Sequence, residues 1–353
     1  MKPRPTFSIC IPNYNYGSVI GQTIESVLSQ SYPHFEIIIS DNASTDNSME
    51  VIKSFKDPRI KSFRNRANIG FAPNLQYATM HARNDFINLL SSDDQMKPGA
   101  LETYAKVIEC FGDDCSRLVL ISDEEHFDEN GIIPTDNRAS RSIYSEFNVP
   151  RMPHIAELDS IVENIEIFSG KDVLRSFLKN LRTYAPFLST IYSRDLWNRV
   201  EGYNVVRTVG PDKYFAFKLL TCDPLVVYIP RKLFRYRIVL TANRASALKN
   251  LRRPIDDYFY TLEYDETRLA GIGLKPNDLK DSLVSKICLQ DGLRMLGSGN
   301  YSQAWRLFAF SLASYPGRAI RFRNFYILLF LLALGPIGKW LAIGLYKLYQ
   351  SRK

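Results

Sequence analysis

Apolar segments and helix-like segments alternate along the first part of the chain, and this alternation restricts the fold more than any other feature. The strand-like segments are residues 7–12, 35–40, 60–65 and 85–90. The helix-like segments are residues 20–30, 48–55 and 73–82. This order predicts an α/β fold in which a mostly parallel sheet is flanked by helices.

Three successive isoleucines, Ile37 to Ile39, lack the alternation of a strand that has one face in water. Such a run is typical of a strand that helices cover on both faces. Because ligands of open α/β sheets bind at the carboxyl ends of the strands, the polar residues that follow each strand are candidate site residues.

Residues beyond 115 show a less regular pattern. The elements that we expect are a strand at 118–121, a polar excursion or lid up to about residue 153, a helix at 170–180, a strand at 224–238 and a helical hairpin over 255–314. The sequence GSGN separates the two helices of the hairpin, and the second helix runs over 301–315.

The composition is that of a globular protein. The 353 residues are 45% hydrophobic and 23% charged, which excludes a collagen-like or wholly disordered chain. Five cysteines without a CxxC pair favour a reducing, cytoplasmic setting. The amino terminus reaches Asn13 before an apolar run of signal-peptide length could form, so we expect no cleaved export signal.

The carboxy-terminal part carries the positive charge. The net charge is +8, and nine Lys and Arg residues follow Asp291 without any Asp or Glu. Residues 325–338 are uncharged and mostly apolar, and Pro336 with its neighbouring glycines should break a helix there. We expect residues 318–353 to lie on an anionic membrane surface, on its cytoplasmic face, and expect no nucleic-acid partner. A buried core helix is the alternative.

Three blocks of sequence, residues 7–48, 64–74 and 84–101, occur in an order and spacing that resembles the family 2 glycosyltransferases of the GT-A fold. Beyond residue 115 the likeness is limited to residues 202–204, 210–220 and 234–238. The resemblance implies a Rossmann-like sheet flanked by helices, followed here by a helical extension and an apolar tail.

The first two blocks contain the residues that the resemblance places beside a nucleotide. Pro12 ends the first strand, while Tyr14 and Asn15 offer a ring and an amide to a base and a ribose. Asp41 follows the buried second strand and, as in the family, would accept the ring N–H of uracil or thymine. A plain strand-ending turn is the alternative for residues 12–15.

The loop after the third strand adds two more candidates. Arg66 and Asn68 lie in the segment that the resemblance places near the nucleotide, where an arginine can pair with phosphate or stack on a base. A solvated surface arginine is equally compatible with the sequence. For Asp46 we favour a helix cap, because the residues after it begin a helix.

Two adjacent carboxylates, Asp93 and Asp94, follow the fourth strand. Such a pair needs a cation or a wet cleft to offset its repulsion, and oxygen ligands suit Mg²⁺ or Mn²⁺ held jointly with a diphosphate. The resemblance implies a DXD-type metal site with Asp94 as the direct ligand and Asp93 touching the ribose or a metal-bound water. Many relatives have a further aspartate where this chain has Ser91. An exposed turn is the alternative.

A general base is needed to remove the proton of the attacking acceptor hydroxyl. Asp212 occupies the place where relatives show an acidic pair, although Pro211 replaces the first acid. The alternative is that Asp212 caps a helix that begins near Lys213. If Asp212 is not the base, the acidic residues of 123–129 are the next candidates.

The resemblance implies an inverting enzyme that moves a sugar from a nucleoside diphosphate sugar, a UDP-sugar, to an acceptor hydroxyl in the assembly of a cell-surface polysaccharide or a lipid-linked glycan. The parts that we expect are a nucleotide-sugar-binding half at 1–115, an acceptor-binding half at 116–250, a helical extension at 251–317 and the membrane-associating tail at 318–353.

Two other classes of protein stay open. One is a nucleotidyltransferase that uses the same aspartate pair, but such enzymes normally have a Gly-rich phosphate loop near the first strand, which residues 11–19 lack. The other is a non-catalytic, membrane-anchored protein that binds sugar nucleotides.

Overall fold

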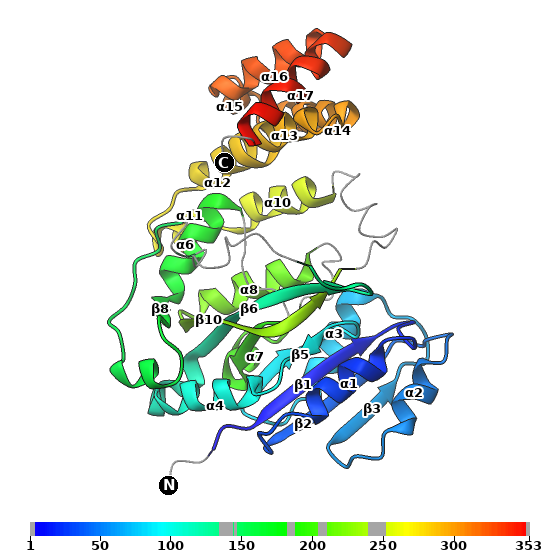
Figure 1. Ribbon diagram of the computed structural model, residues 1–353. Helices are drawn as coiled ribbons and strands as arrows, with labels where there is room; N and C mark the ends of the chain where they lie inside the picture. Colours follow the sequence, from blue (N-terminus) through cyan, green and yellow to red (C-terminus); the bar gives the residue numbers. More distant parts are fainter. Residues whose placement is uncertain are drawn as a thin grey trace. The chain divides into compact units, whose positions relative to one another are not determined.

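The structure is a computed structural model that describes residues 4–133, 144, 147–181, 188–203, 210–238 and 252–350 (Figure 1). The chain forms two compact units, residues 1–174 with 183–239 and residues 175–182 with 240–353. Part of the expected lid (134–143), Asn204, Arg352 and Lys353 lie outside the described residues.

The first unit is built on one sheet, and its first four strands are parallel. These are β1 (Phe7–Asn13), β2 (Phe35–Asp41), β3 (Ile60–Arg64) and β4 (Phe86–Leu89), in the spatial order β3-β2-β1-β4. The register pairs Asn13 with Asp41 and Asp41 with Arg64, so the carboxyl ends of β1, β2 and β3 meet at one edge. The expected α/β sheet is confirmed.

The remaining strands make the sheet mixed. They are β5 (Gln95–Met96), β6 (Leu118–Asp128), β7 (Gly131–Ile133), β8 (Glu166–Ser169), β9 (Thr190–Ser193) and β10 (Leu225–Arg237). Strand β9 lies antiparallel between β4 and β6, while β10 pairs parallel with β6 and antiparallel with β5 and β8. We expected a mostly parallel sheet, and the pairing is parallel among the first four strands and between β6 and β10, but antiparallel at β5, β7, β8 and β9.

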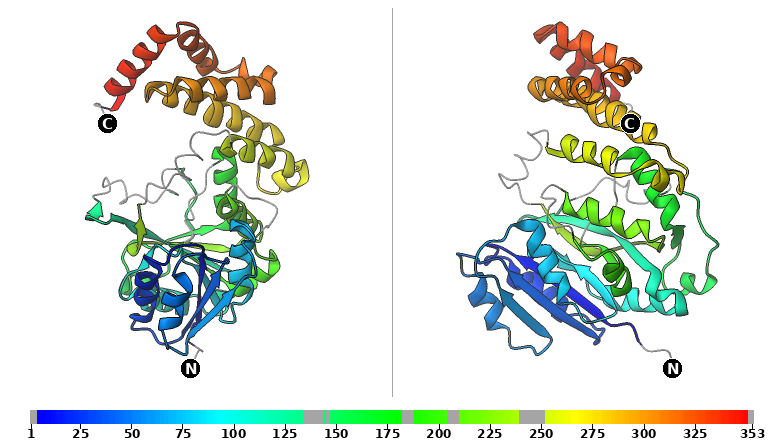
Figure 2. Two further views of the ribbon diagram at one scale, coloured as in Figure 1. Left: turned by 90° about the vertical axis from the view of Figure 1, so that its right-hand side faces the viewer. Right: turned by 180° about the vertical axis from the view of Figure 1, so that it is seen from behind.

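Helices lie on both faces of this sheet (Figure 2). The helices of the first unit are α1 (Ile20–Leu28), α2 (Ser48–Ser54), α3 (Phe71–Met80), α4 (Ala100–Glu109), η1 (Gly112–Arg117), η3 (Ala156–Ser160), α7 (Arg194–Arg199) and α8 (Pro211–Thr221). Ile37 and Ile39 pack in the core with α1, α2 and α4, and Ile38, which points to the other face, is equally buried. A strand covered on both faces explains the unbroken apolar run.

Helix α6 (Gly170–Asn180) begins in the first unit and ends in the second. The other helices of the second unit are α10 (Arg252–Glu263), α11 (Glu266–Ala270), α12 (Pro276–Ser282), the π-helix η4 (Leu283–Gln290), α13 (Asp291–Gly297), α14 (Tyr301–Ser314), α15 (Pro316–Ala319), α16 (Arg323–Ala333) and α17 (Pro336–Gln350). The expected break near Pro336 is confirmed, because Gly335 adopts a φ of 57° after α16 and Pro336 begins α17. Among the described residues, no helix has the length and apolarity to cross a membrane.

Candidate functional site

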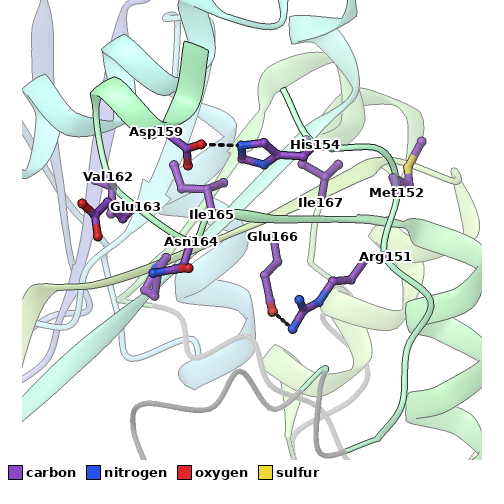
Figure 3. A pocket seen from close by; sticks show the side chains of 11 residues that line it. Arg151, Met152, His154, Asp159, Val162, Glu163, Asn164, Ile165, Glu166 and Ile167 are labelled. Carbon is purple, nitrogen blue, oxygen red and sulfur yellow. Dashed lines mark hydrogen bonds and ion pairs between the residues drawn. The ribbon is translucent and has the colours of Figure 1, made fainter. Parts of the chain in front are cut away.

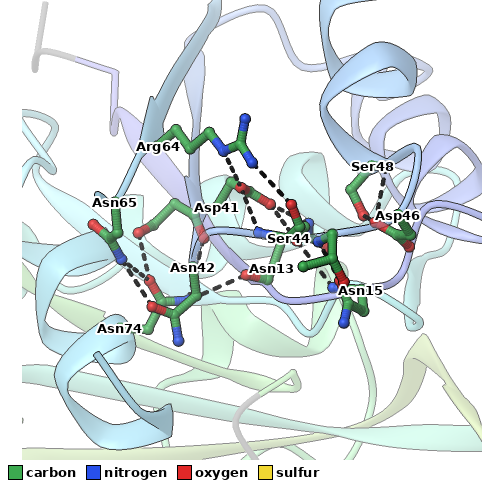
Figure 4. Close-up of polar contacts among 12 residues, drawn as sticks. Asn13, Asn15, Asp41, Asn42, Ser44, Asp46, Ser48, Arg64, Asn65 and Asn74 are labelled. Carbon is green, nitrogen blue, oxygen red and sulfur yellow. Dashed lines mark hydrogen bonds and ion pairs between the residues drawn. The ribbon is translucent and has the colours of Figure 1, made fainter. Parts of the chain in front are cut away.

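The carboxyl ends of β1 and β2 form a buried polar cluster around Asp41 (Figure 4). Oδ1 of Asp41 accepts hydrogen bonds from Asn13 Nδ2 at 2.8 Å and from Ser44 Oγ at 2.5 Å. Its Oδ2 accepts the backbone N–H of Ser44 at 3.1 Å and lies 3.5 Å from Arg64 Nε. The carboxylate is fully buried. These hydrogen bonds and the nearby arginine offset the free-energy cost of removing its charge from water.

Residues 12–15 connect this cluster with the loop that carries the two adjacent aspartates. The carbonyl oxygen of Pro12 accepts a hydrogen bond from Ser92 Oγ at 2.7 Å. Asn15 has a φ of 59°, and its Oδ1 accepts the N–H of Thr45 at 2.8 Å. The ring of Tyr14 is exposed. The backbone here is fixed by side-chain contacts, and one aromatic face is left accessible beside them.

Of the two candidates in the next loop, Asn68 is tied into the fold and Arg66 is exposed. Asn68 Oδ1 accepts hydrogen bonds from Asn42 Nδ2 at 2.8 Å and from the N–H of Gly70 at 2.9 Å. The sequence reasoning missed Arg64, which is the arginine that reaches Asp41 and also donates to the carbonyl oxygen of Ser44 at 2.9 Å. Its place at the end of β3, in register with Asp41, was the signal.

Asp46 has a structural role. Its Oδ1 accepts the N–H of Ser48, the first residue of α2, at 3.0 Å, and its Oδ2 accepts the N–H of Gly17 at 2.8 Å. The N-cap residue of α2 is Asn47 and not the expected Asp46, but the Asp46 carboxylate supports the start of α2 and fastens it to the segment before α1.

Asp94 is the most unusual carboxylate of the site. It is 1% exposed, and one oxygen, Oδ1, accepts the backbone N–H of Arg237 at 2.9 Å. The other oxygen, Oδ2, is buried and has no hydrogen-bond partner among the described residues. Burial, together with the negative charge of Asp93, raises the pKa of Asp94 to about 8.

Further charged groups surround the aspartate pair. Arg237, at the end of β10, donates from Nε to the carbonyl oxygen of Asp93 at 2.9 Å and stacks on the ring of Phe127 at 4.4 Å. Glu124 contributes to the raised pKa of Asp94, and burial raises the pKa of Glu124 itself. The sequence reasoning assigned no role to Arg237, and it held Glu124 only as one of several acids in residues 123–129.

The donor set of this cluster fits a divalent cation. The unpartnered oxygen of Asp94 and the neighbouring Asp93 supply the hard oxygen ligands that Mg²⁺ and Mn²⁺ prefer. A cation there would also offset the repulsion between carboxylates that lie in a poorly solvated place. Within the described part of the chain, no three His, Cys, Asp or Glu residues gather closely enough to hold a metal ion by themselves.

Asp212 lies in the first turn of α8, as the second residue of the helix after Pro211. Gly210, with a φ of 61°, is the residue that precedes the helix, so the suggestion that Asp212 caps a helix starting near Lys213 is wrong. Asp212 is half-buried, and among the described residues no hydrogen-bond donor occupies its carboxylate. Burial and the negative charge of Asp212 both raise the pKa of the neighbouring Tyr203.

Comparison with known proteins identifies the segment that holds most of these residues, whereas Asp212 and Arg237 lie beyond it. Residues 8–175 match the family described as glycosyl transferase family 2. This segment is a family 2 glycosyltransferase domain. The resemblance expected from the sequence is confirmed.

Similar proteins extend the comparison along the chain. EpsE of Bacillus subtilis (strain 168) is 25% identical over 276 residues, which cover 74% of this chain and 88% of EpsE. WfaP of Escherichia coli, a UDP-Glc:alpha-D-GlcNAc-diphosphoundecaprenol beta-1,3-glucosyltransferase, is 41% identical over 87 residues, which cover 25% of this chain and 35% of WfaP. The crystal structure of S. aureus TarS 1–349 in complex with UDP-GlcNAc has a TM-score of 0.58 at 15% identity and covers 92% of this chain and 90% of TarS 1–349, which shows a shared fold.

The first unit has a pocket of 950 Å³ beside β8 (Figure 3). His154 and Asp159 face each other there at 2.9 Å, and Arg151 pairs with Glu166. The hydroxyl of Tyr228 donates to Asp123 Oδ1 at 2.8 Å, and the charges of Asp123 and Glu166 add to the effect of burial in raising the pKa of Tyr228. The polar wall of the pocket therefore lies near the acidic segment that continues to Glu124.

Proposed function

We propose that this glycosyltransferase transfers a sugar from a UDP-sugar to an acceptor hydroxyl with inversion of the anomeric centre. The observation that carries the proposal is the buried, unpartnered oxygen of Asp94 beside Asp93, at the sheet edge where donors bind in open α/β folds. A buried carboxylate oxygen without a partner among the described residues is destabilising to the fold, and a bound cation would satisfy it.

The donor's base would bind at the ends of β1 and β2. Asp41 would accept the ring N–H of uracil, Tyr14 would cover the ring, and Asn15, Arg66 and Asn68 would line the nucleotide. Because four donors already surround Asp41, base binding would exchange one Ser44 contact for the ring N–H. The UDP and UDP-GlcNAc complexes of the similarly folded TarS support a uridine nucleotide.

Asp94, assisted by Asp93, would hold Mg²⁺ or Mn²⁺ together with the diphosphate of the donor. When bound, the metal supplies positive charge to the departing diphosphate. Arg237 fixes the loop that carries both aspartates, since it donates to the backbone of Asp93 and to the side chain of Asp94.

Asp212 would act as the general base. In an inverting displacement its carboxylate takes the proton of the acceptor hydroxyl while the hydroxyl oxygen forms the new bond to the anomeric carbon and the nucleoside diphosphate leaves. A half-buried carboxylate in the first turn of a helix can accept that proton.

The acceptor would enter through the pocket beside β8, which falls within the half of the chain that we expect to bind the acceptor. Its mixture of His154, Asp159, Glu163 and Arg151 with apolar walls suits the hydroxyl groups and ring faces of a glycan. The name of the similar WfaP, a transferase for a diphosphoundecaprenol-linked sugar, supports a polysaccharide or lipid-linked glycan as the acceptor class.

The deciding experiment screens UDP-sugars for metal-dependent release of UDP by the full chain, followed by NMR of the glycoside formed. We expect release that depends on Mg²⁺ or Mn²⁺ and a product of inverted configuration. Binding of a donor without turnover would instead indicate a non-catalytic sugar-nucleotide binding protein. Release of pyrophosphate from a nucleoside triphosphate would indicate a nucleotidyltransferase.

A further inference from the structure

Helices α16 and α17 carry apolar side chains on their solvent-exposed faces as well as on the faces that pack in the core of the second unit. Phe325, Leu328, Leu331 and Leu332 of α16 are buried in the hydrophobic core of the second unit. The opposite sides of both helices are also apolar. A helix that is apolar all round is usually buried on all sides or in contact with lipid.

The outward sides carry two rows, which we call the exposed stripes. Their members recur at intervals of three and four residues, so each row follows one face of its helix. Ile337, Phe330, Leu345 and Trp340 are 64%, 61%, 62% and 74% exposed. The full membership is Tyr326, Leu329, Phe330 and Ala333 of α16, and Ile337, Trp340, Leu341, Gly344, Leu345 and Leu348 of α17. In an ordinary surface helix these are the positions of polar residues.

Positive charge accompanies the exposed stripes. The chain has no Asp or Glu after Asp291. No ion pair within the described residues involves Arg321, Arg323, Lys339 or Lys347, whereas Arg318 is held by Asp281 at 2.6 Å. Four cations thus border the apolar rows without acidic partners from their own unit.

We propose that the exposed stripes bind the surface of an anionic lipid bilayer and hold the protein there as a peripheral anchor. Trp340 and Tyr326 are residue types that favour the boundary between headgroups and acyl chains. A second copy of the chain is a poorer partner, because it would bring the same four cations together. The anchor lies in the membrane surface, since no described helix can span the bilayer.

The test is co-sedimentation of the full chain with vesicles of phosphatidylcholine mixed with phosphatidylglycerol. The stripe variant F330S/W340S/L345S changes exposed side chains and leaves the buried face of α16 intact, which deletion of residues 318–353 would not. We expect this variant to reduce vesicle partitioning by at least about tenfold, because each change removes a large apolar area from the lipid contact. The matched control M80S/I132S/L262S removes equally exposed apolar side chains elsewhere and should bind like the natural chain.

A second variant, R321Q/K339Q/K347Q, separates the contribution of charge. It should weaken binding to the anionic vesicles several-fold at low salt and leave the weaker binding to pure phosphatidylcholine unchanged. Absence of vesicle binding by the natural chain would overturn the proposal. So would a dimer in sedimentation velocity that the stripe variant dissociates while vesicle binding stays unaffected. UDP release without an acceptor should be equal in all of these variants. A loss of vesicle binding can therefore be told apart from a loss of the proposed transfer reaction.

Discussion

At the scale of single residues, Asp94 combines two properties that a purely structural aspartate would not have. It is almost completely buried, and one of its oxygens has no partner among the described residues. Because its pKa of about 8 leaves the buried carboxyl mostly neutral at pH 7, replacing it with an amide should not destabilise the fold, whereas loss of the carboxylate as a metal ligand should disable the enzyme.

We therefore expect Asp94→Asn to lower kcat by at least about 10²-fold and to leave Tm unchanged or raised. Metal-dependent UDP release and calorimetry measure the two effects. Asp57→Asn, which changes a solvent-accessible ion-paired aspartate, is the control and should retain activity. Normal turnover by Asp94→Asn would refute the metal assignment.

At Asp212, substitution should separate an effect on kcat from an effect on donor binding. Asp212→Asn keeps the shape of the side chain but removes its basicity, so kcat should fall by roughly 10²- to 10⁴-fold while the KM of the donor stays nearly constant. Steady-state kinetics at varied donor concentration measures both. Asp172→Asn, in the first turn of α6, controls for the loss of a negative charge at a helix start. Equal loss in the control, or unchanged kcat at Asp212, would assign the base to another residue.

Some residues of the candidate site could be predicted from the sequence, and others could not. Asp41, Asp93 and Asp94 follow buried strands, and their local pattern was sufficient to select them. Arg64 lies on β3, the next strand after β2 in the chain, and was missed although its position at the strand end was available, whereas Arg237 was missed because its role comes from pairing between strands far apart in the chain. Arg237 reaches Asp94 across 143 positions. Local periodicity contains no information about such a contact.

At the scale of elements, strands β1, β2 and β3 are joined by a buried polar contact as well as by their backbones. Glu36 of β2 accepts hydrogen bonds from Ser8 Oγ at 2.7 Å, from Lys61 Nζ at 2.6 Å and from the N–H of Arg83 at 2.9 Å. Burial alone would raise the pKa of Glu36, but these donors outweigh it and leave the pKa below its ordinary value.

A carboxyl whose pKa is lower in the folded than in the unfolded state stabilises the protein above the unfolded pKa, and this contribution is lost as pH falls through the folded pKa. We expect Glu36→Gln to lower the free energy of unfolding by about 1–2 kcal/mol at neutral pH. The difference from the natural chain should shrink below about pH 4.5. Urea unfolding at several pH values measures it, and the exposed Glu50→Gln should show no such trend.

Helices α16 and α17 approach each other closely at Gly338. A Cβ atom built on Gly338 would lie 1.8 Å from the carbonyl oxygen of Leu331, whereas a Cβ on Gly344 of the same helix would meet no atom within 4 Å. Gly338→Ala should therefore destabilise the second unit by about 2 kcal/mol or more. Gly344→Ala should stabilise it by up to about 1 kcal/mol, because alanine is the better helix former. Thermal unfolding of both variants would test this, and equal effects would contradict the close contact.

Elements with strong local signals agreed with the sequence analysis. Helix α6 has the predicted bounds. The turn at Gly335 and Pro336 lies where proline and glycine were expected to break the helix. Strand β9, Thr190–Ser193, was not predicted. Its antiparallel place in the sheet is decided by packing against β4 and β6, which no local pattern encodes.

At the scale of the whole molecule, the chain combines two units, and each unit supplies residues for a different proposed role. Residues of the first unit supply the aspartate pair, the polar cluster around Asp41 and the pocket beside β8. The second unit supplies the exposed stripes and the four cations beside them, and it also includes residues 175–182, which precede parts of the first unit in the chain. We therefore expect the proposed transfer and the proposed anchoring to respond independently to substitution.

The central position of β9 also leaves one edge of β4 unpaired for a long interval during synthesis. Strand β4 is complete at Leu89, yet the neighbour that covers its free side begins at Thr190. A ribosome that adds about 5–20 residues per second needs roughly 5–20 s to bridge that interval. During this time the nascent protein exposes an unpaired strand edge of the kind that promotes aggregation. The short strand β9, which the sequence analysis did not predict, thus sets how long this edge of β4 stays unpaired.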